Sequence, residues 1–377
     1  MRNTYSVYVR NADSGPACYY RIVQYVEELD RKGQGAVRSA LTKKEFCANL
    51  NCANGIRKKL LQGILYMRIL RRRLLALLTD LILYRPGTVV IQRELIPRRL
   101  PLLFDTLVRM IGRNADIIWD FDDDIFESGE ISGREKKLLL EQSSMIIVVS
   151  TYLKQLLPVE YRDKVIVLPT TEKCFLKDSQ EDMLKQRKKT YAKEVSLVWA
   201  GTSGNLNHLE PVINELDAAA KRLQDTCRKS MKLVVVCNRS YQAPCTLKHL
   251  KVENIPWSRQ NAQKSIRNAH IAIMPLKNTQ FAEGKGGFKL VQCMASGIPA
   301  IASDVGYNRE IVNQKTGFLI RNGSSGAWEE AVCCLAGDGK RWEDSCRGAY
   351  EKYRNDFNFM DNLAVWEKLL MGGHSGQ

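Results

Sequence analysis

Residues 283–312 of the chain read EGKGGFKLVQCMASGIPAIASDVGYNREIV, and this stretch decides the fold. Its loop, rich in Gly and Lys, precedes a predicted helix over about Phe288–Ser296, which Gly297 and Pro299 bring to an end. A short apolar strand, Ala300–Ser303, and a second Gly loop follow. Glycines let backbone N–H groups approach a ligand, and positive charge at a helix N-terminus favours an anion. The stretch therefore predicts an α/β unit with a site for a phosphorylated ligand.

From Lys285 to Pro299 the sequence matches the pattern K-x-G-F-K-L-x-Q-x-M-A-x-G-x-P in register. This segment resembles the donor-binding signature of family 4 glycosyltransferases, and in particular a bacterial branch of that family. The resemblance implies the GT-B fold, in which two Rossmann-like, doubly wound domains face a cleft. Taken without the resemblance, the same residues also fit an ordinary βαβ unit with a Lys-bearing loop.

A chain of 377 residues is long enough for two domains. Short apolar runs alternate with helical patterns, as in doubly wound α/β sheets, and the alternation restarts after the polar stretch 179–193, which we take as a linker. The predicted strands are Tyr5–Val9, Thr88–Gln92, Ala115–Asp120, Met145–Ser150, Lys164–Leu168, Val195–Ala200, Lys232–Cys237 and Ala269–Met274, with Ala300–Ser303. We expect an acceptor-binding domain over 1–178 and a donor-binding domain over 194–354. The resemblance implies that a C-terminal helix, about 355–377, packs back on the first domain.

The cysteines and histidines predict neither a disulfide framework nor a metal centre. The chain has 11 cysteines, an odd number without a Cys-x-x-Cys pair, and its 4 histidines are dispersed. This usage is typical of a reducing compartment. The N-terminal residues lack an apolar core of signal-peptide length, and no apolar run is long enough for a spanning helix. We therefore expect a cytoplasmic protein that needs no metal or other cofactor.

The net charge of +16 is the unusual global property of the chain. Positive charge suits phosphorylated ligands, anionic lipids or nucleic acid. No helix-turn-helix, RNP-type or zinc-knuckle pattern is present, so we do not expect a nucleic-acid partner. From Cys47 to Thr79 there is no acidic residue, while Arg, Lys and Leu alternate. Residues 53–79 therefore predict either a surface helix of the first domain or a contact with an anionic membrane.

A second candidate phosphate loop, Trp199–Asn205, follows a predicted strand. Its counterpart in the resembling family lines the donor diphosphate, commonly with an Arg or Lys that is missing here, which leaves the charge to Lys285 and Lys289. The resemblance also implies two glutamates eight positions apart. Gln292 stands at the second position and Glu283 one place from the first, and Gln292 can still hydrogen-bond a ribose hydroxyl. The candidate donor-binding residues are Gly201, Thr202, Gly204, Glu283, Lys285, Gly286, Gly287, Phe288, Lys289, Gln292 and Glu310.

The most acidic cluster, Asp120-Phe-Asp-Asp-Asp124, ends a predicted strand of the first domain. Carboxylates can bind a divalent metal, but the resemblance implies that such a run lines the acceptor side of the cleft. We favour the second interpretation, with Asp122 and Asp123 as hydrogen-bond acceptors for substrate hydroxyls. A solvated acidic turn is the structural alternative. The candidate acceptor-side residues are Ser14, Arg21, Glu94 and Asp120, all at strand ends or in loops that follow strands.

The resemblance implies transfer of a sugar from a nucleotide diphosphate donor to an acceptor hydroxyl. Lys289 would neutralise the leaving diphosphate, and Asp122 and Asp123 would complete the catalytic set. Family members that retain the anomeric configuration are thought to use the leaving phosphate as the base, which agrees with the absence of histidine before His208. The basic helix suggests a lipid-linked acceptor at the inner face of the plasma membrane, as in bacterial surface polysaccharide or lipopolysaccharide assembly. A nucleotide-sugar epimerase of GT-B fold and a non-catalytic basic binding protein are the alternatives.

Overall fold

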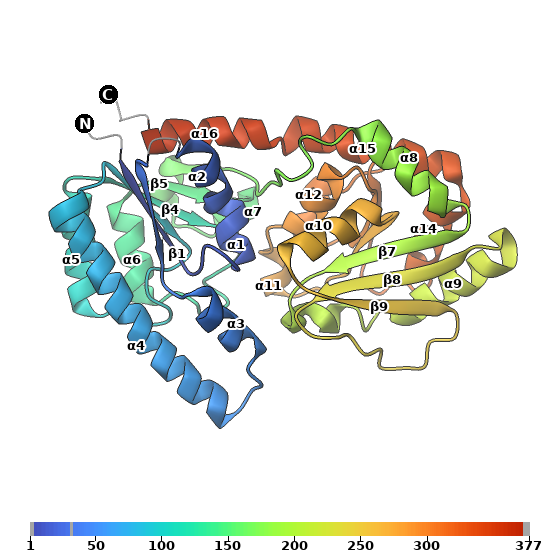
Figure 1. Cartoon of the computed structure of the whole chain (residues 1–377), viewed down its shortest axis with the longest axis horizontal. Coiled ribbons are helices and arrows are strands. Elements are labelled where there is room, and N and C mark those ends of the chain that lie inside the picture. Colours follow the sequence, from blue (N-terminus) through green and yellow to red (C-terminus); the bar gives the residue numbers. More distant parts are fainter. Residues whose placement is uncertain (1–3, 31–32, 372–377) are drawn as a thin grey trace. The chain divides into compact units, whose positions relative to one another are not determined.

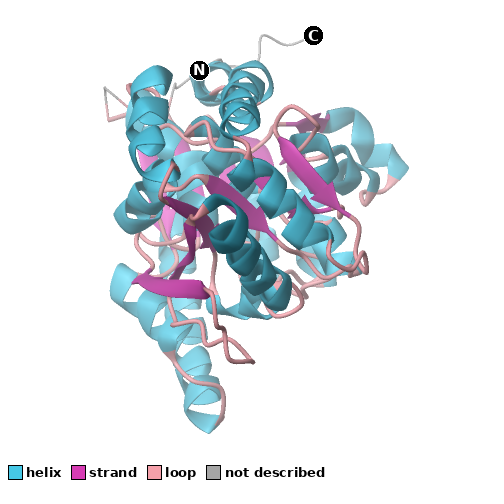
Figure 2. Ribbon diagram, turned by 90° about the vertical axis from the view of Figure 1, so that its right-hand side faces the viewer, coloured by secondary structure: helices cyan, strands magenta, loops and turns pink. Residues whose placement is uncertain are grey.

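The computed structural model describes residues 4–30 and 33–371, which form two compact units. Unit 1 contains the described residues up to Thr170, the short segment Gly284–Gly286 and the residues from Phe359 onward. Unit 2 contains Thr171–Glu283 and Gly287–Asn358. Each unit has its own parallel sheet with helices on both sides, as the strands and helices of Figure 2 show. The predicted α/β fold class, with two doubly wound domains, is confirmed.

The sheet of unit 1 has, in the described residues, six parallel strands in the order β2-β1-β3-β4-β5-β6. They are β1 (Tyr5–Val9), β2 (Gly35–Ser39), β3 (Thr88–Gln92), β4 (Asp116–Phe121), β5 (Ser143–Val148) and β6 (Val165–Val167). Strands β1 and β3 are buried throughout, as apolar strands covered on both faces are. Because β1 lies between β2 and β3, the chain reverses its direction of travel across the sheet between β1 and β3. The carboxyl ends of these strands are therefore the expected ligand edge of unit 1.

Helices cover both faces of this sheet (Figure 1). They are α1 (Pro16–Cys18), the π-helical turn η1 (Tyr19–Val23), α2 (Gln24–Leu29), α3 (Lys43–Asn51), α4 (Ile56–Thr79), the π-helical turn η2 (Asp80–Tyr84), α5 (Leu102–Gly112), α6 (Gly133–Gln142), α7 (Thr151–Gln155), the 3-10 turn η3 (Val159–Lys164) and α16 (Phe359–Met371). Helices α4, α5 and α6 contribute leucines, isoleucines and Phe104 to one core with the strand residues Ile91, Trp119 and Ile146. Helix α16 packs against α2, where Phe359 stacks on Tyr25 with ring centroids 5.0 Å apart.

The sheet of unit 2 also has six parallel strands in the described residues, in the order β12-β11-β10-β7-β8-β9. They are β7 (Glu194–Ala200), β8 (Ser230–Cys237), β9 (Leu250–Pro256), β10 (Ile271–Met274), β11 (Ala300–Ser303) and β12 (Gly317–Ile320). The reversal lies between β7 and β10, so the loops after these two strands form the ligand edge of unit 2.

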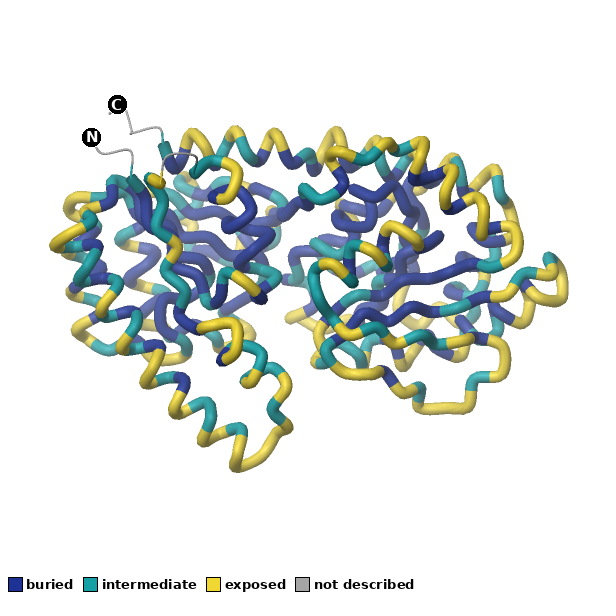
Figure 3. Tube along the Cα trace, viewed as in Figure 1, coloured by how far each residue is buried: buried dark blue, intermediate teal, exposed yellow. Residues whose placement is uncertain are grey.

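The helices of unit 2 are α8 (Gln180–Tyr191), the 3-10 turn η4 (Ser203–His208), α9 (Ile213–Cys227), α10 (Arg259–Asn268), α11 (Gln280–Glu283), α12 (Phe288–Ala295), α13 (Asn308–Ile311), α14 (Ala327–Gly337) and α15 (Gly339–Asp356). Helices α9 and α14 share one core, while α10, α12 and α15 share another with the opposite face of the strands. In Figure 3 the central strands of both units are buried, whereas the edge strands β2 and β9 and the outer faces of the helices are more exposed.

Residues 179–193, which the sequence suggested as a linker, contain helix α8 of unit 2, and the chain leaves unit 1 at Thr170 instead. Ser179 caps this helix by accepting a hydrogen bond from the Asp182 N–H, at 3.3 Å. Acidic residues lie in its first turn and Lys188 and Lys189 in its last turn, as the helix dipole favours. Its polar composition reflects one solvated face, because Leu184 and Tyr191 on the other face are buried.

Candidate functional site

Three loops of unit 2 meet at the ligand edge of its sheet. His208, after β7, accepts a hydrogen bond through Nδ1 from the N–H of Lys277, after β10, at 3.0 Å. The N–H of Leu276 donates in turn to the hydroxyl of Ser303, the last residue of β11, at 2.9 Å. The structure therefore brings the loops after β7, β10 and β11 together, as the parallel strand order requires.

The loop after β7 contains the predicted residues Gly201, Thr202 and Gly204. A Cβ atom at Gly201 would lie 2.6 Å from the Trp199 ring, so only glycine fits there. The Asn205 side chain donates to the Thr202 hydroxyl at 3.0 Å, while a Cβ atom at Gly204 would meet open space. The Gly201 N–H donates to the Val236 carbonyl oxygen at 3.0 Å, and the Ser203 N–H donates to Asn238 Oδ1 at 2.8 Å. The loop therefore has Thr202 and Gly204, and no cation, for a ligand.

Helix α12 begins at this edge. Its N-cap residue is Gly287, which has φ of +61° and no side chain that could cap the first turn. The N-terminus of a helix attracts anions through its first N–H groups and through the helix dipole. Lys289, in the first turn, lines a small cavity with Ala200 and Met274, at the carboxyl ends of β7 and β10, and its Nζ lies 5.3 Å from the centroid of the Phe288 ring. The unit-2 edge thus combines a helix N-terminus, a glycine loop and a lysine, which suits a diphosphate.

Glu283 is held within unit 2 by a partner that the sequence did not point to. Its carboxylate accepts hydrogen bonds from the Gly306 N–H, at 2.9 Å, and from Arg309 Nη1, at 3.0 Å. Arg309 also pairs with Asp304 at 2.7 Å. These contacts fasten the loop after β11 to α11. The predicted residue Glu310 follows Arg309 in α13. Burial raises the pKa of the Glu310 carboxyl, and the positive charge of Lys352 opposes this shift.

Gln292 is buried in α12, and its side chain is directed to Glu172. Its Nε2 donates to the Glu172 carboxylate at 2.7 Å. Glu172 is itself fully buried and accepts a hydrogen bond from the Cys174 N–H at 2.9 Å. The amide of Gln292 therefore donates a hydrogen bond to a buried carboxylate, that of Glu172, which the sequence analysis did not predict as a site residue.

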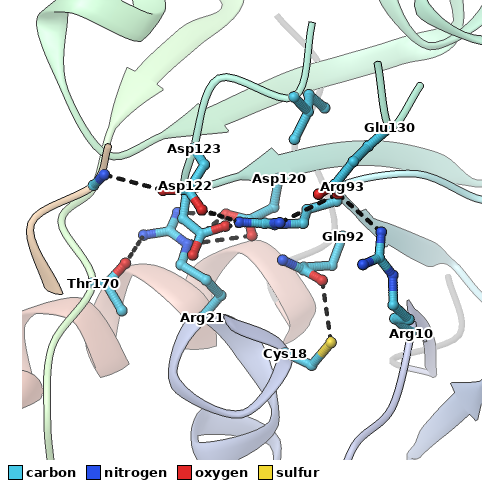
Figure 4. Close-up of polar contacts among 12 residues, drawn as sticks. Arg10, Cys18, Arg21, Gln92, Arg93, Asp120, Asp122, Asp123, Glu130 and Thr170 are labelled. Carbon is cyan, nitrogen blue, oxygen red and sulfur yellow. Dashed lines mark hydrogen bonds and ion pairs between the residues drawn. The ribbon is translucent and has the colours of Figure 1, made fainter. Parts of the chain in front are cut away.

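In unit 1, a network of arginines and carboxylates lies at the carboxyl ends of the strands (Figure 4). Arg93, directly after β3, pairs with Asp122 through Nε at 2.8 Å, with Asp123, and with Glu130 at 3.3 Å. Burial alone lowers the pKa of Arg93, but the three carboxylates outweigh it and raise the pKa well above its ordinary value. Arg93 was not among the predicted site residues, because its partners are remote in the sequence.

Two predicted acceptor-side residues form a buried ion pair. Arg21 and Asp120 are both almost fully buried, with Arg21 Nε 3.1 Å from Asp120 Oδ1. Arg21 also donates to the Leu168 carbonyl oxygen at 2.7 Å and to the Thr170 hydroxyl at 3.2 Å. The structure thus shows this pair holding the chain after β6 to β4.

The other predicted acceptor-side residues also have structural partners. Glu94 binds Arg10, whose Nε lies 2.9 Å from Glu94 Oε1. Arg10 also forms an ion pair with Glu130, with Nη2 2.9 Å from Oε2. The N–H of Ser14 donates to Asn11 Oδ1 at 2.6 Å and closes the turn after β1.

Asp123 is the more exposed of the two aspartates that bind Arg93, with 32% of its side chain accessible against 13% for Asp122. Its Oδ1 accepts a hydrogen bond from the Gly286 N–H at 3.2 Å. Burial and then the charge of Asp122 raise the pKa of Asp123, against the charges of Arg93 and Lys285. Burial lowers the pKa of Lys285, against the charge of Asp123. The structure therefore places Lys285 and Gly286 with Asp123 in unit 1 and Lys289 in unit 2.

Two properties of the described residues bear on wider expectations. Residues 4–30 and 33–371 contain no group of three His, Cys, Asp or Glu side chains arranged to hold a metal ion. None of their helices combines the length and the apolar composition needed to cross a membrane.

Residues 188–338 match the family model of glycosyl transferases group 1. Among solved structures, a glycosyltransferase from Rickettsia africae has a TM-score of 0.65 and 14% identity, over 100% of this chain and 100% of its own. HepE from Anabaena, in complex with UDP and glucose, has a TM-score of 0.64 and 12% identity, over 97% of this chain and 99% of its own. The N-terminal domain of trehalose-6-phosphate phosphatase from Candida albicans has a TM-score of 0.59 and 12% identity, over 98% and 97%. Among curated proteins, no sequence matches the chain.

Proposed function

We propose that the protein is a glycosyltransferase that moves a sugar from a nucleotide diphosphate donor to an acceptor hydroxyl. The match of residues 188–338 to the family model of glycosyl transferases group 1 and the similarity of the fold to solved glycosyltransferase structures support this proposal. The observation that carries the proposal is the start of α12 in unit 2. There the N-terminus of α12, with the glycine Gly287 as its N-cap residue, and the side chain of Lys289 lie beside the glycine loop after β7. Fold alone does not decide function, and this arrangement supports the proposal because a helix N-terminus with a lysine beside it suits a diphosphate.

In this proposal the donor diphosphate lies against the first turn of α12. The N–H groups of this turn and the ammonium of Lys289 stabilise the negative charge that grows as the diphosphate leaves. Thr202 and Gly204 supply further hydrogen-bond donors, while Gly201, whose N–H donates to the Val236 carbonyl oxygen, shapes the loop. UDP is the first nucleotide to test, because HepE was solved in complex with UDP and glucose.

The acceptor hydroxyl, we propose, donates a hydrogen bond to Asp123 in unit 1. Asp123 is the most accessible of the three carboxylates that pair with Arg93, and Arg93, which Asp122 also binds, fixes its position. Asp123 then orients the hydroxyl for transfer, and the raised pKa of its carboxyl suits a group that exchanges protons with a sugar hydroxyl. Asp123→Asn should raise the KM for the acceptor while donor binding is unchanged.

The finer assignment is to the bacterial branch of family 4, with retention of the anomeric configuration and without a required metal ion. The support for it is the match from Lys285 to Pro299 and the cationic N-terminus of α12, which offers the charge that a metal would otherwise supply. A lipid-linked acceptor in surface polysaccharide or lipopolysaccharide assembly fits the basic first unit. NMR of the product linkage and activity in excess EDTA test retention and metal independence.

The first experiment is a thermal-shift comparison of UDP-, GDP- and ADP-sugars with the wild type and with Lys289→Ala. A ligand that binds only the folded protein raises the apparent melting temperature. We expect stabilisation by one nucleotide class, lost in Lys289→Ala but kept in Lys221→Ala, which removes an exposed lysine from α9. Equal stabilisation of both variants would contradict the placement of the diphosphate.

Product analysis then separates transfer from epimerisation. A transferase releases the nucleotide and extends an acceptor, whereas an epimerase changes the donor sugar in a mixture that contains no acceptor. Conversion of the donor sugar alone would overturn the proposed transfer.

A further inference from the structure

Helix α4 carries a row of apolar side chains that faces solvent. Ile56, Leu60, Ile64, Met67 and Leu75 are 54% to 78% exposed. Their spacing of three, four or eight residues puts them on one side of the helix, together with Arg71. Figure 3 shows exposed segments along the length of α4. We name these five residues the outer row.

The opposite side of α4 fixes this orientation. Leu65, Ile69 and Leu77 are buried in the core of unit 1. Arg73 is buried with them and donates to the carbonyl oxygens of Leu95, at 3.1 Å, and Val9, at 2.9 Å. The helix therefore has one apolar side that is buried in the core of unit 1 and a second that is largely exposed. An exposed apolar row of this size marks an interaction surface.

Cations accompany the outer row. Arg57, Lys59 and Arg71 are exposed, and none of them forms an ion pair with any residue in the described part of the chain. Arg68 and Arg72 pair with Glu45 of α3, which offsets part of their charge. The partner of this surface must therefore accept both exposed apolar side chains and positive charge.

We propose that the outer row and its cations dock α4 on an anionic lipid bilayer, with the helix axis parallel to the membrane plane. Apolar side chains enter the acyl boundary while lysines and arginines meet lipid phosphates, which is how interfacial amphipathic helices bind. A second copy of the chain would bring equal positive charge against the same row, and nucleic acid offers no apolar phase to receive it. Docking of this kind does not depend on the proposed sugar transfer.

Flotation of the full chain with vesicles tests the proposal. Vesicles of phosphatidylglycerol and phosphatidylcholine are compared with pure phosphatidylcholine, at low and high salt. One variant shortens the row, Leu60→Ser/Met67→Ser, and a second removes charge, Arg57→Gln/Arg71→Gln. The matched control, Val159→Ser/Met360→Ser, removes two exposed apolar side chains elsewhere. The melting temperature of each variant is measured first to show that it is folded.

The wild type and the control should float with anionic vesicles and not with neutral ones. Removing two cations should weaken binding roughly 25-fold, at about fivefold for each cation near an anionic surface. Shortening the row should weaken binding to the same vesicles at both salt concentrations. Absence from the floating fraction would overturn the proposal, as would equal binding of all variants. Concentration-dependent dimerisation that the row variant abolishes would assign the surface to a second copy instead. A chain that floats but shows no response to UDP-, GDP- or ADP-sugars would keep this inference and count against the proposed function.

Discussion

Glu172 and Gln292 explain at the level of single residues why an amide stands where the resembling family has a glutamate. Glu172 is fully buried, and Gln292 donates to it at 2.7 Å. A glutamate at 292 would set two carboxylates against each other in a site without solvent, where like charges are strongly unfavourable. The amide is therefore matched to its neighbour within unit 2.

Gln292→Glu should lower the free energy of unfolding by about 3 to 5 kcal/mol at pH 8, the cost of an uncompensated buried charge. The loss should be smaller at pH 5, because one carboxyl can then hold a proton and donate to the other. Urea unfolding of the wild type and Gln292→Glu at both pH values measures this loss of stability. The double variant Glu172→Gln/Gln292→Glu restores an amide opposite a carboxylate and should recover much of the stability. A single variant as stable as the wild type at pH 8 would show that the pair is not coupled.

His270 predicts a pH dependence of stability in unit 2. Its Nδ1 accepts the Ser196 N–H at 2.9 Å, and burial, with the nearby charge of Arg187, lowers the pKa of His270 to about 4. Below the ordinary histidine pKa of about 6.5 the unfolded chain binds a proton that the folded protein refuses, so stability falls as the pH decreases from about 6.5 to about 4.

His270→Gln should therefore flatten the curve of stability against pH in this window, where the wild type loses roughly 1.4 kcal/mol for each pH unit between the two pKa values. Urea unfolding of the wild type, His270→Gln and His249→Gln, which changes an exposed histidine, measures the difference. Parallel curves for the wild type and His270→Gln would contradict the assignment.

At the scale of elements, the loop into α12 depends on a single glycine. Gly287 has φ of +61°, and a Cβ atom there would lie 2.4 Å from Ile311 Cδ1. Gly287→Ala should lower the free energy of unfolding by about 1 to 3 kcal/mol, the typical cost of a strained backbone conformation. The same change should weaken donor stabilisation in the thermal-shift assay, because the first turn of α12 is displaced. Gly204→Ala, whose Cβ atom meets open space, should leave unfolding unchanged.

The sequence predicted the central strands better than the edge strands. β1 and β3 lie where expected, because strands buried on both faces are apolar along their length. β2, β9 and β12 were not predicted, and each lies at an edge of its sheet, where half-exposed positions interrupt the apolar pattern.

The candidate site was likewise predicted only in part. Its loops follow from strand ends and glycines, which are local signals, so the loop after β7 and the aspartates after β4 could be named in advance. Arg93, Glu130, Arg309 and Glu172 could not, since each is set by a partner that only the folded chain brings near.

At the scale of the whole molecule, unit 1 depends on the last described helix of the chain. Phe359 and Trp366 of α16 are fully buried, and both pack on Tyr25 of α2. Trp366→Ala should lower the free energy of unfolding by about 3 to 5 kcal/mol, as expected for a buried aromatic side chain. Hydrogen exchange should accelerate in α2 of unit 1. Met360→Ala, on the exposed side of α16, should leave exchange in α2 unchanged, and faster exchange confined to unit 2 in Trp366→Ala would refute the dependence.

This dependence determines the order in which the two units can complete their folding during synthesis. Unit 2 ends at Asn358, whereas unit 1, although it begins first, still lacks Gly284–Gly286 and α16 at the moment when Thr170 leaves the ribosome. Nascent domains usually fold in the order in which they are made. Here the earlier unit must wait, with the surface around Tyr25 uncovered, until the later unit has been translated completely. A chaperone that shields apolar surface should therefore associate with nascent unit 1 for longer than with nascent unit 2.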